Sequence, residues 1–154
     1  MRRRRPEQRA ILPDTKYNDL SVAKFINYIM NNGKKGVAEK IFYGSMDIIK
    51  RKTKTDGIKI FKKGIENTSP SVEVKSRRIG GATYQVPIEV PKKRAFYLAS
   101  LWIINASTNA SGKPMSEKLA TELIAAANGD GNAIKKKEDT HRMADANKAF
   151  AHFR

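Results

Sequence analysis

Residues 72–90 have the sequence VEVKSRRIGGATYQVPIEV, in which apolar and polar residues alternate on both sides of a glycine pair. A period of two is typical of β-strands, and two such runs around Gly80-Gly81 predict a β-hairpin. Most of the chain on either side has helical spacing instead. We therefore predict that this hairpin is a single insert in a helical protein.

The register of the hairpin depends on the length of its loop. A two-residue loop at the glycine pair would place Glu73 opposite Ile88, which mixes polar and apolar side chains on one face. Register usually follows the apolar face of a strand pair. We therefore expect a three-residue loop, 79–81 or 80–82, with a glycine in the left-handed conformation.

Five segments outside the hairpin have apolar residues at intervals of three and four, the spacing that gives a helix one apolar face, and a sixth segment, 95–106, is almost continuously apolar. The last segment along the chain carries a stripe of Met143, Ala146, Ala149, Phe150 and Phe153. The expected helical segments are 22–30, 34–54, 57–69, 95–106, 116–127 and 134–153.

The fold predicted from these patterns is mainly α, a six-helix bundle with a protruding two-stranded β-hairpin between the third and fourth helices. We expect a basic N-terminal arm at 1–18, which carries five arginines and in which two prolines disfavour a helix. A single helical domain at 19–154 then carries the β-ribbon at about 71–91. The segment 95–106 is apolar nearly all round, which predicts a helix buried on most sides.

The charge of the chain indicates a polyanionic partner. Lys and Arg number 31 against 15 Asp and Glu, a formal charge of +16 at pH 7, while 40% of the residues are hydrophobic and favour a folded body. Like charges on one domain repel each other, and nucleic acid is a common compensating partner. No run of about 18 apolar residues predicts a spanning helix, so we expect no membrane partner.

No motif points to catalysis, a metal or a cofactor. The two histidines, His141 and His152, have no cysteine or spaced carboxylate beside them to complete a metal site. The glycine-lysine pairs near residues 33–36 and 112–113 lack the frame of a phosphate-binding loop. We therefore expect a binding protein and not an enzyme. The residues alone leave two hypotheses open. The protein is either a scaffold that binds and orders RNA or a free DNA-binding protein.

Basic residues gather in loops and at the ends of elements, where phosphate groups can be reached. Arginine forks match phosphate oxygens and can stack on bases. Lysines that open the last helix lie where the helix dipole also attracts an anion. Tyr84 lies near the hairpin tip, where it either stacks on an unpaired base or belongs to the core.

Four stretches of the chain resemble a known family. They are ILPD at 11–14, NGKK at 32–35, the hairpin at 72–90, and KKKEDTHRMADANKAF at 135–150. Together they resemble the small-subunit ribosomal protein seven family in its bacterial form, over essentially the whole chain. A departure lies around residues 92–100, where many bacterial members carry more arginine and this chain has Pro91 and Phe96-Tyr97-Leu98.

The resemblance implies a six-helix bundle with a β-ribbon and a role as a structural constituent of the small ribosomal subunit. It implies a primary rRNA-binding protein that docks on the three-prime major domain and nucleates assembly of the subunit head. Implied neighbours are exit-site tRNA, the mRNA exit path and small-subunit proteins nine and eleven. The implied location is the cytoplasm, in the ribosome. We expect no cofactor and no homo-oligomer.

The resemblance also implies which residues face RNA. The expected rRNA contacts are Arg2, Arg3, Arg4, Arg5, Arg9, Lys34, Lys35, Lys75, Arg77, Arg78, Lys92, Lys93, Arg94, Lys113, Lys135, Lys136, Lys137, His141 and Arg142. The residues expected near tRNA and mRNA are Arg77, Arg78, Gly80, Gly81, Thr83, Tyr84, Lys148 and Arg154.

Overall fold

The fold was obtained from a computed structural model, which describes residues 9–153 without the Phe153 side chain. By internal contacts the chain divides into two compact units, Met1–Glu39 and Lys40–Arg154. That residues 19–154 act as one domain stays a prediction.

The first unit contains α1 (Leu20–Ile29) and the end of the predicted arm. Asp19 caps α1, because its side chain accepts the backbone N–H of Ser21 at 2.7 Å. The buried Asp14 carboxylate accepts the backbone N–H of Tyr17 at 3.0 Å. These two aspartates satisfy donors that a turn and a helix start leave open, and so they fix how the chain enters α1.

Two helices begin the second unit, α2 (Lys35–Thr53), which also spans the boundary, and α3 (Gly57–Thr68). Asp56 caps α3. The rings of Phe42 and Phe61 meet edge to face, with centroids 5.4 Å apart and planes at 88°. The two helices therefore pack through a buried aromatic pair, which was predicted only as two separate apolar faces.

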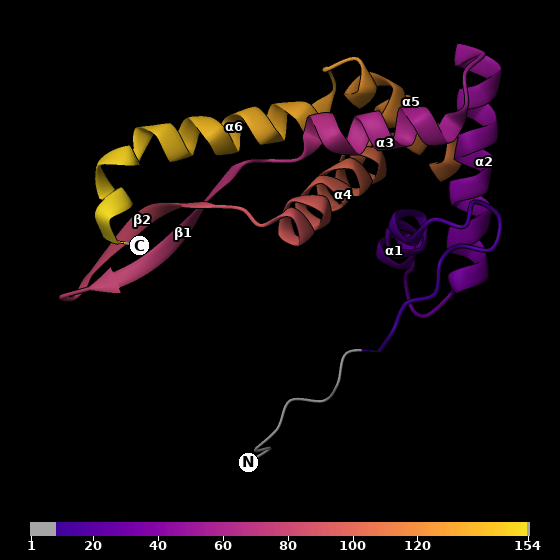
Figure 1. The fold of residues 1–154 in the computed structure, drawn as a ribbon. Helices are drawn as coiled ribbons and strands as arrows, with labels where there is room; N and C mark the ends of the chain where they lie inside the picture. The colour runs from indigo at the N-terminus through magenta and orange to yellow at the C-terminus, as the bar shows by residue number, and fades with distance from the viewer. Residues whose placement is uncertain (1–8, 154) are drawn as a thin grey trace. The chain divides into compact units, whose positions relative to one another are not determined.

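Three more helices complete the core, α4 (Lys92–Asn109), α5 (Met115–Ala127) and α6 (Asn132–Ala146). Helix α5 contacts both α3 and α4, and α6 contacts α4 (Figure 1). The buried side chains of these three helices include Leu98, Ile103, Leu119, Leu123, Ala126 and Ile134. Within residues 9–153 the chain thus forms six α-helices in the predicted order, which confirms the fold class.

The segment of α4 that was predicted to be buried on most sides is covered over most of its circumference. Leu98, Ser100 and Ile103 are buried, and Leu101 and Trp102 are half-buried. Within 95–106 only Asn105 is exposed.

The β-ribbon consists of β1 (Val72–Ile79) and β2 (Ala82–Glu89), paired antiparallel between α3 and α4. Its register places Ile79 opposite Ala82 and Glu73 opposite Ile88, so the loop is the two glycines alone. The predicted three-residue loop is therefore wrong.

Turn chemistry and charge pairing explain this register. Gly80 and Gly81 have φ of 57° and 91°, the two positive values that a two-residue type I′ turn requires. Glu73 is buried on the face of Ile88, but it forms ion pairs with Arg94 at 3.2 Å and Lys75 at 3.5 Å. A paired carboxylate can occupy a covered face, so the apolar-face rule does not exclude this register.

The last helix ends earlier than predicted. Helix α6 stops at Ala146, and a 3-10 helix, η1 (Lys148–Phe153), follows it. The Asn147 amide donates to the Met143 carbonyl at 2.8 Å, and Met143 is 49% exposed. The apolar stripe predicted for 134–153 therefore does not form one continuous buried face. The chain changes direction after α6, and η1 packs against β2 (Figure 1).

Candidate RNA-binding surface

Arg77 and Arg78 lie at the tip of the ribbon, opposite Tyr84 and Thr83 across the strands. Both arginines are exposed, and in the described part of the chain neither side chain has a hydrogen bond or ion pair. A guanidinium without a protein partner keeps all its donors for an external acceptor such as phosphate. The tip therefore presents two arginines ready to bind an anion.

Lys75 and Arg94 lie at the base of the ribbon and have protein partners. Both pair with Glu73, and Arg94 also lies over the Tyr97 ring, 5.4 Å from its centroid. Their positive charge is partly compensated at this point. An RNA phosphate that contacts Lys75 or Arg94 therefore either replaces Glu73 as the partner or binds in addition to it.

The first turn of α4 presents two exposed lysines, Lys92 and Lys93. Pro91 lies at the N-cap of this helix and no side chain caps it, so no capping side chain satisfies the first N–H groups beside the lysines. Lys113 is likewise exposed, next to Gly112 with its φ of 80° in the loop before α5. These positions suit phosphate groups sterically and electrostatically.

The start of α6 divides its three lysines between two roles. Lys135 and Lys136 are exposed, whereas the half-buried Lys137 donates to the Asn67 carbonyl at 2.6 Å. The Glu122 carboxylate accepts the N–H of Ala133 at 2.8 Å. Glu122 thus already occupies part of the helix end that attracts anions. The helix dipole therefore favours phosphate binding here less than the sequence suggested.

Two further expected RNA contacts in α6 are also engaged within the protein. The His141 Nε2 accepts the backbone N–H of Ser71 at 3.2 Å, which ties α6 to the start of β1. Arg142 is exposed and pairs with Asp139 at 3.6 Å. His141 therefore has a structural role whether or not it meets RNA.

Two of the residues expected near tRNA and mRNA are brought to one end of the second unit. Tyr84 is half-buried and its ring lies 5.4 Å from that of Phe150 in η1, the element that also carries the exposed Lys148. The ribbon and η1 are neighbours in Figure 1. Of the two roles left open for Tyr84, packing within the protein is the one observed.

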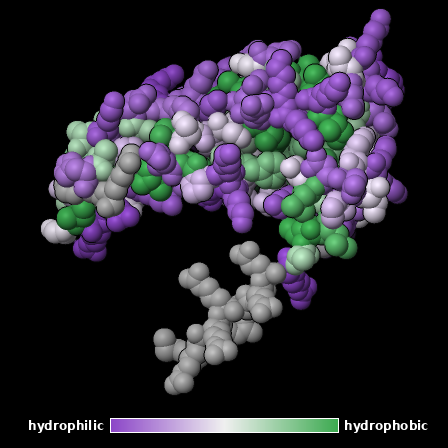
Figure 2. Space-filling view, in the orientation of Figure 1, coloured by the Kyte–Doolittle hydropathy of each residue, from purple (hydrophilic) through white to green (hydrophobic). Residues whose placement is uncertain are grey.

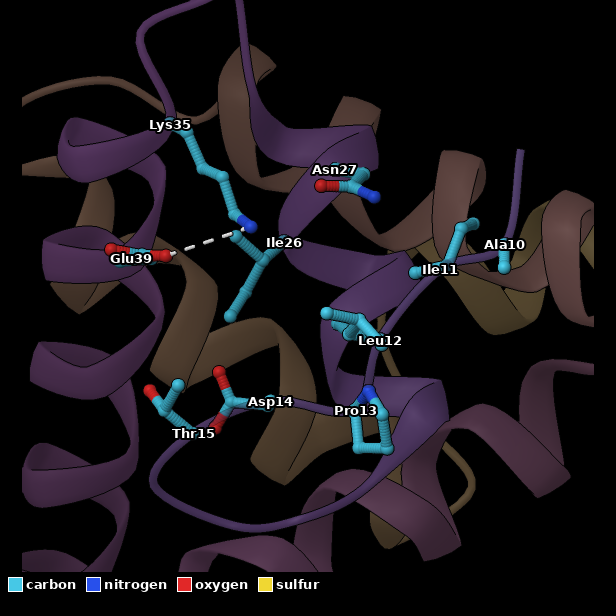
Figure 3. A pocket seen from close by; sticks show the side chains of 11 residues that line it. Ala10, Ile11, Leu12, Pro13, Asp14, Thr15, Ile26, Asn27, Lys35 and Glu39 are labelled. Atoms are coloured by element: carbon cyan, nitrogen blue, oxygen red, sulfur yellow. Dashed lines mark ion pairs between the residues drawn. The ribbon is translucent and has the colours of Figure 1, made fainter.

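The first unit carries Arg9, Lys34 and Lys35, all exposed. A hollow of about 430 Å³ lies between the arm and α1, and in it Lys35 faces Glu39 at 4.0 Å (Figure 3). Lys34 has no acidic partner in the described chain. Arg2 to Arg5 and Arg154 lie outside the described residues.

Further cations are exposed at positions that were not among the expected contacts. Lys50, Arg51 and Lys52 close α2, and Lys59 and Lys63 lie on α3. Their signal in the sequence was the run of three cations at 50–52, which also has a structural explanation at a helix C-terminus. Hydrophilic side chains dominate much of the visible face over α3 and α6 (Figure 2).

Residues 9–153 contain no group of three or more histidine, cysteine, aspartate or glutamate side chains that could hold a metal ion. Over the same range, no helix combines the length and apolar character needed to cross a membrane.

Comparison with known proteins agrees with the resemblance noted in the sequence. The family described as ribosomal protein S7p/S5e matches residues 1–148. Small ribosomal subunit protein uS7 of Thermotoga maritima is 58% identical over 154 residues, covering 100% of this chain and 99% of that protein. The proteins of the same name from Gemmatimonas aurantiaca and Novosphingobium aromaticivorans are 57% and 53% identical, each over 99% of this chain and 98% of theirs. The chain therefore belongs to the ribosomal protein S7p/S5e family.

Proposed function

We propose that the protein is a structural, RNA-binding constituent of the small ribosomal subunit, located with the ribosome in the cytoplasm. Its family consists of ribosomal proteins, which agrees with the expectation that it is not an enzyme. The observation that carries the proposal is the pair of exposed, unpartnered arginines at the ribbon tip, Arg77 and Arg78, in a protein of charge +16.

The proposed rRNA site is distributed over several elements. Among the described residues, the exposed cations whose side chains have no protein partner are Arg77, Arg78, Lys92, Lys93, Lys113, Lys135 and Lys136 in the second unit, and they include Arg9 and Lys34 in the first. Lys75, Arg94, Lys137, His141 and Arg142 belong to the same proposed set but already have protein partners. Dispersed phosphate contacts suit recognition of an RNA by its shape.

The finer role follows from the family resemblance. We propose docking on the three-prime major domain of small-subunit rRNA, nucleation of head assembly, and contacts with small-subunit proteins nine and eleven. We further propose that the ribbon tip and η1 face exit-site tRNA and the mRNA exit path. The contact between Tyr84 of β2 and Phe150 of η1 supports this proposal, because it holds the two elements close enough to face the same RNA.

A binding titration tests the RNA partner. If ~6–10 phosphates are contacted, affinity for a three-prime major-domain RNA falls by ~10³–10⁵ between ~50 and ~200 mM salt. A duplex DNA of matched length serves as the competitor, and we expect it to be displaced. A flat salt response, or DNA bound as tightly as the RNA, would contradict the proposal.

Photo-crosslinking tests the tRNA and mRNA neighbours. A crosslinking amino acid at Arg78 is expected to label tRNA or mRNA in assembled ribosomes, and one at Lys59 on α3 serves as the control. Labelling of rRNA alone from Arg78 would contradict the assignment of the tip and leave the rRNA-binding role intact.

A further inference from the structure

A hollow of about 320 Å³ lies on the second unit, between α4 and the start of α6. This volume is within the range of small-ligand sites in proteins. The residues that line it are Trp102, Asn105, Ala106, Asn109, Asn132 and Lys136.

Trp102 forms the aromatic part of the hollow. Asn105, Ala106 and Asn109 follow it at intervals of three, four and seven, so the four side chains lie on one face of α4. The buried stripe of α4 contains Ile103 instead, and Trp102 stays half-exposed. A half-exposed indole beside the small Ala106 is open to a flat ligand.

The rim of the hollow carries polar groups without protein partners. Among residues 9–153, neither the Asn105, Asn109 and Asn132 carboxamides nor the Lys136 ammonium has a hydrogen bond or ion pair. Each carboxamide offers both donors and an acceptor, which can match the edge of a nucleobase. The lysine adds a positive charge that can meet a phosphate.

The lining contains no acidic side chain. A purely apolar hollow would suit a hydrophobic side chain of a partner protein, and a purely basic one would suit phosphate alone. An aromatic surface, amide edges and one cation together match a single unpaired nucleotide.

We propose that this hollow binds one unpaired nucleotide of RNA, with its base stacked on Trp102. The Asn105 and Asn109 carboxamides hydrogen-bond the base edge, and Lys136 contacts the phosphate. The inference rests on the proposed RNA-binding function and assigns a particular role to residues outside the basic clusters, except for Lys136.

Trp102 is the only tryptophan in the chain, so its fluorescence reports on this hollow alone. The full-length protein is titrated with a short single-stranded RNA of mixed sequence, labelled for anisotropy, and with the matching duplex. We expect both RNAs to bind by charge. The single strand quenches Trp102 emission and the duplex does not.

Variants identify the contacts. Trp102→Leu is expected to weaken single-strand binding roughly 5- to 150-fold, the loss of one stacked base, while duplex binding stays unchanged. Trp102→Phe keeps a stacking surface and restores much of the affinity. Lys136→Ala should reduce quenching at a given RNA concentration more than Lys135→Ala, a matched loss of charge outside the hollow. Far-ultraviolet circular dichroism confirms that each variant is folded.

The outcomes separate the inference from the proposed function. Single-strand binding without quenching, or equal effects of the two lysine variants, would overturn the nucleotide site and leave general RNA binding intact; the hollow would then be free for a protein side chain. Failure of the wild-type protein to bind any RNA would contradict both.

Discussion

Glu73 illustrates at the scale of one residue how the protein uses its excess of cations. Its side chain is 11% exposed and pairs with Arg94 at 3.2 Å and Lys75 at 3.5 Å. A carboxylate removed from water is tolerated only with partners that restore hydrogen bonds and charge. Glu73 thus holds the base of the ribbon to the first turn of α4.

Replacement of Arg94 by alanine tests this role. The Arg94 side chain is 44% exposed, so water screens the ion pair and we expect a loss of about 1 kcal/mol in the free energy of unfolding. Urea denaturation measures it. Arg78→Ala removes the same charge from a residue without a partner and should change stability by less than about 0.5 kcal/mol. Equal losses in the two variants would show that the Glu73 pair does not stabilise the fold.

The sequence alone could not distinguish cations that bond within the protein, such as Arg94, from exposed cations such as Arg78. Arg94 lies 21 positions from Glu73, and Lys137 and His141 each lie 70 positions from the residues they bond. Charge and local spacing suggest RNA contact for all of them, because the partner within the protein becomes visible only after folding. The side chains of Arg77 and Arg78, by contrast, have no such partner between residues 9 and 153.

At the scale of elements, apolar spacing predicted five of the six helices and a nearly continuous apolar sequence predicted α4, because the buried faces of a helix are apolar. The apolar pattern failed where a local preference decided instead. The two glycines of the ribbon set a two-residue turn, and the amide of Asn147 lies at the break between α6 and η1. The nucleotide-sized hollow was also not predicted, since it joins Trp102 of α4 to Asn132 and Lys136 of α6.

Two glycines, one in α2 and one in α3, predict opposite effects of a substitution by alanine. A Cβ at Gly57 would lie 2.9 Å from the Met46 carbonyl oxygen, whereas a Cβ at Gly36 would meet nothing within 4 Å. Gly57→Ala should therefore destabilise the protein by about 1–3 kcal/mol through a clash with backbone. Gly36→Ala should stabilise it by up to about 1 kcal/mol, because alanine favours a helix. Thermal denaturation measures both, and a stabilising Gly57→Ala would disprove the close approach.

The attachment of η1 to the ribbon depends on Phe150. Its ring packs against Tyr84 at 5.4 Å, and we expect Phe150→Ala to remove an aromatic contact of about 0.5–1.5 kcal/mol in addition to buried area. Amide hydrogen exchange should then become faster in residues 148–152 while the core helices stay protected. Met143→Ala, which truncates a 49% exposed side chain, is the control and should leave these rates unchanged.

At the scale of the whole molecule, the charge of +16 affects folding and binding in opposite directions. Like charges repel within the free protein, and salt screens that repulsion over a Debye length of about 8–10 Å. We expect the melting temperature of the free protein to rise between ~50 and ~200 mM salt, the range in which its affinity for RNA falls. Differential scanning calorimetry measures the first effect. A melting temperature that falls with salt would mean that ion pairs outweigh repulsion.

The salt dependence of binding can be divided among the cations, because each phosphate contact adds its own share to the slope. Replacing a lysine or arginine that contacts phosphate should lower the slope of log affinity against log salt by about 1. We expect Arg77→Ala with Arg78→Ala to lower it by about 2, and Arg94→Ala to lower it by less than one, since Glu73 already neutralises part of that charge. All of these variants lose cations only, so a slope that depended on net charge alone would fall by the same amount per residue. Unequal slopes would instead show that the partners of each cation within the fold determine which ones bind RNA.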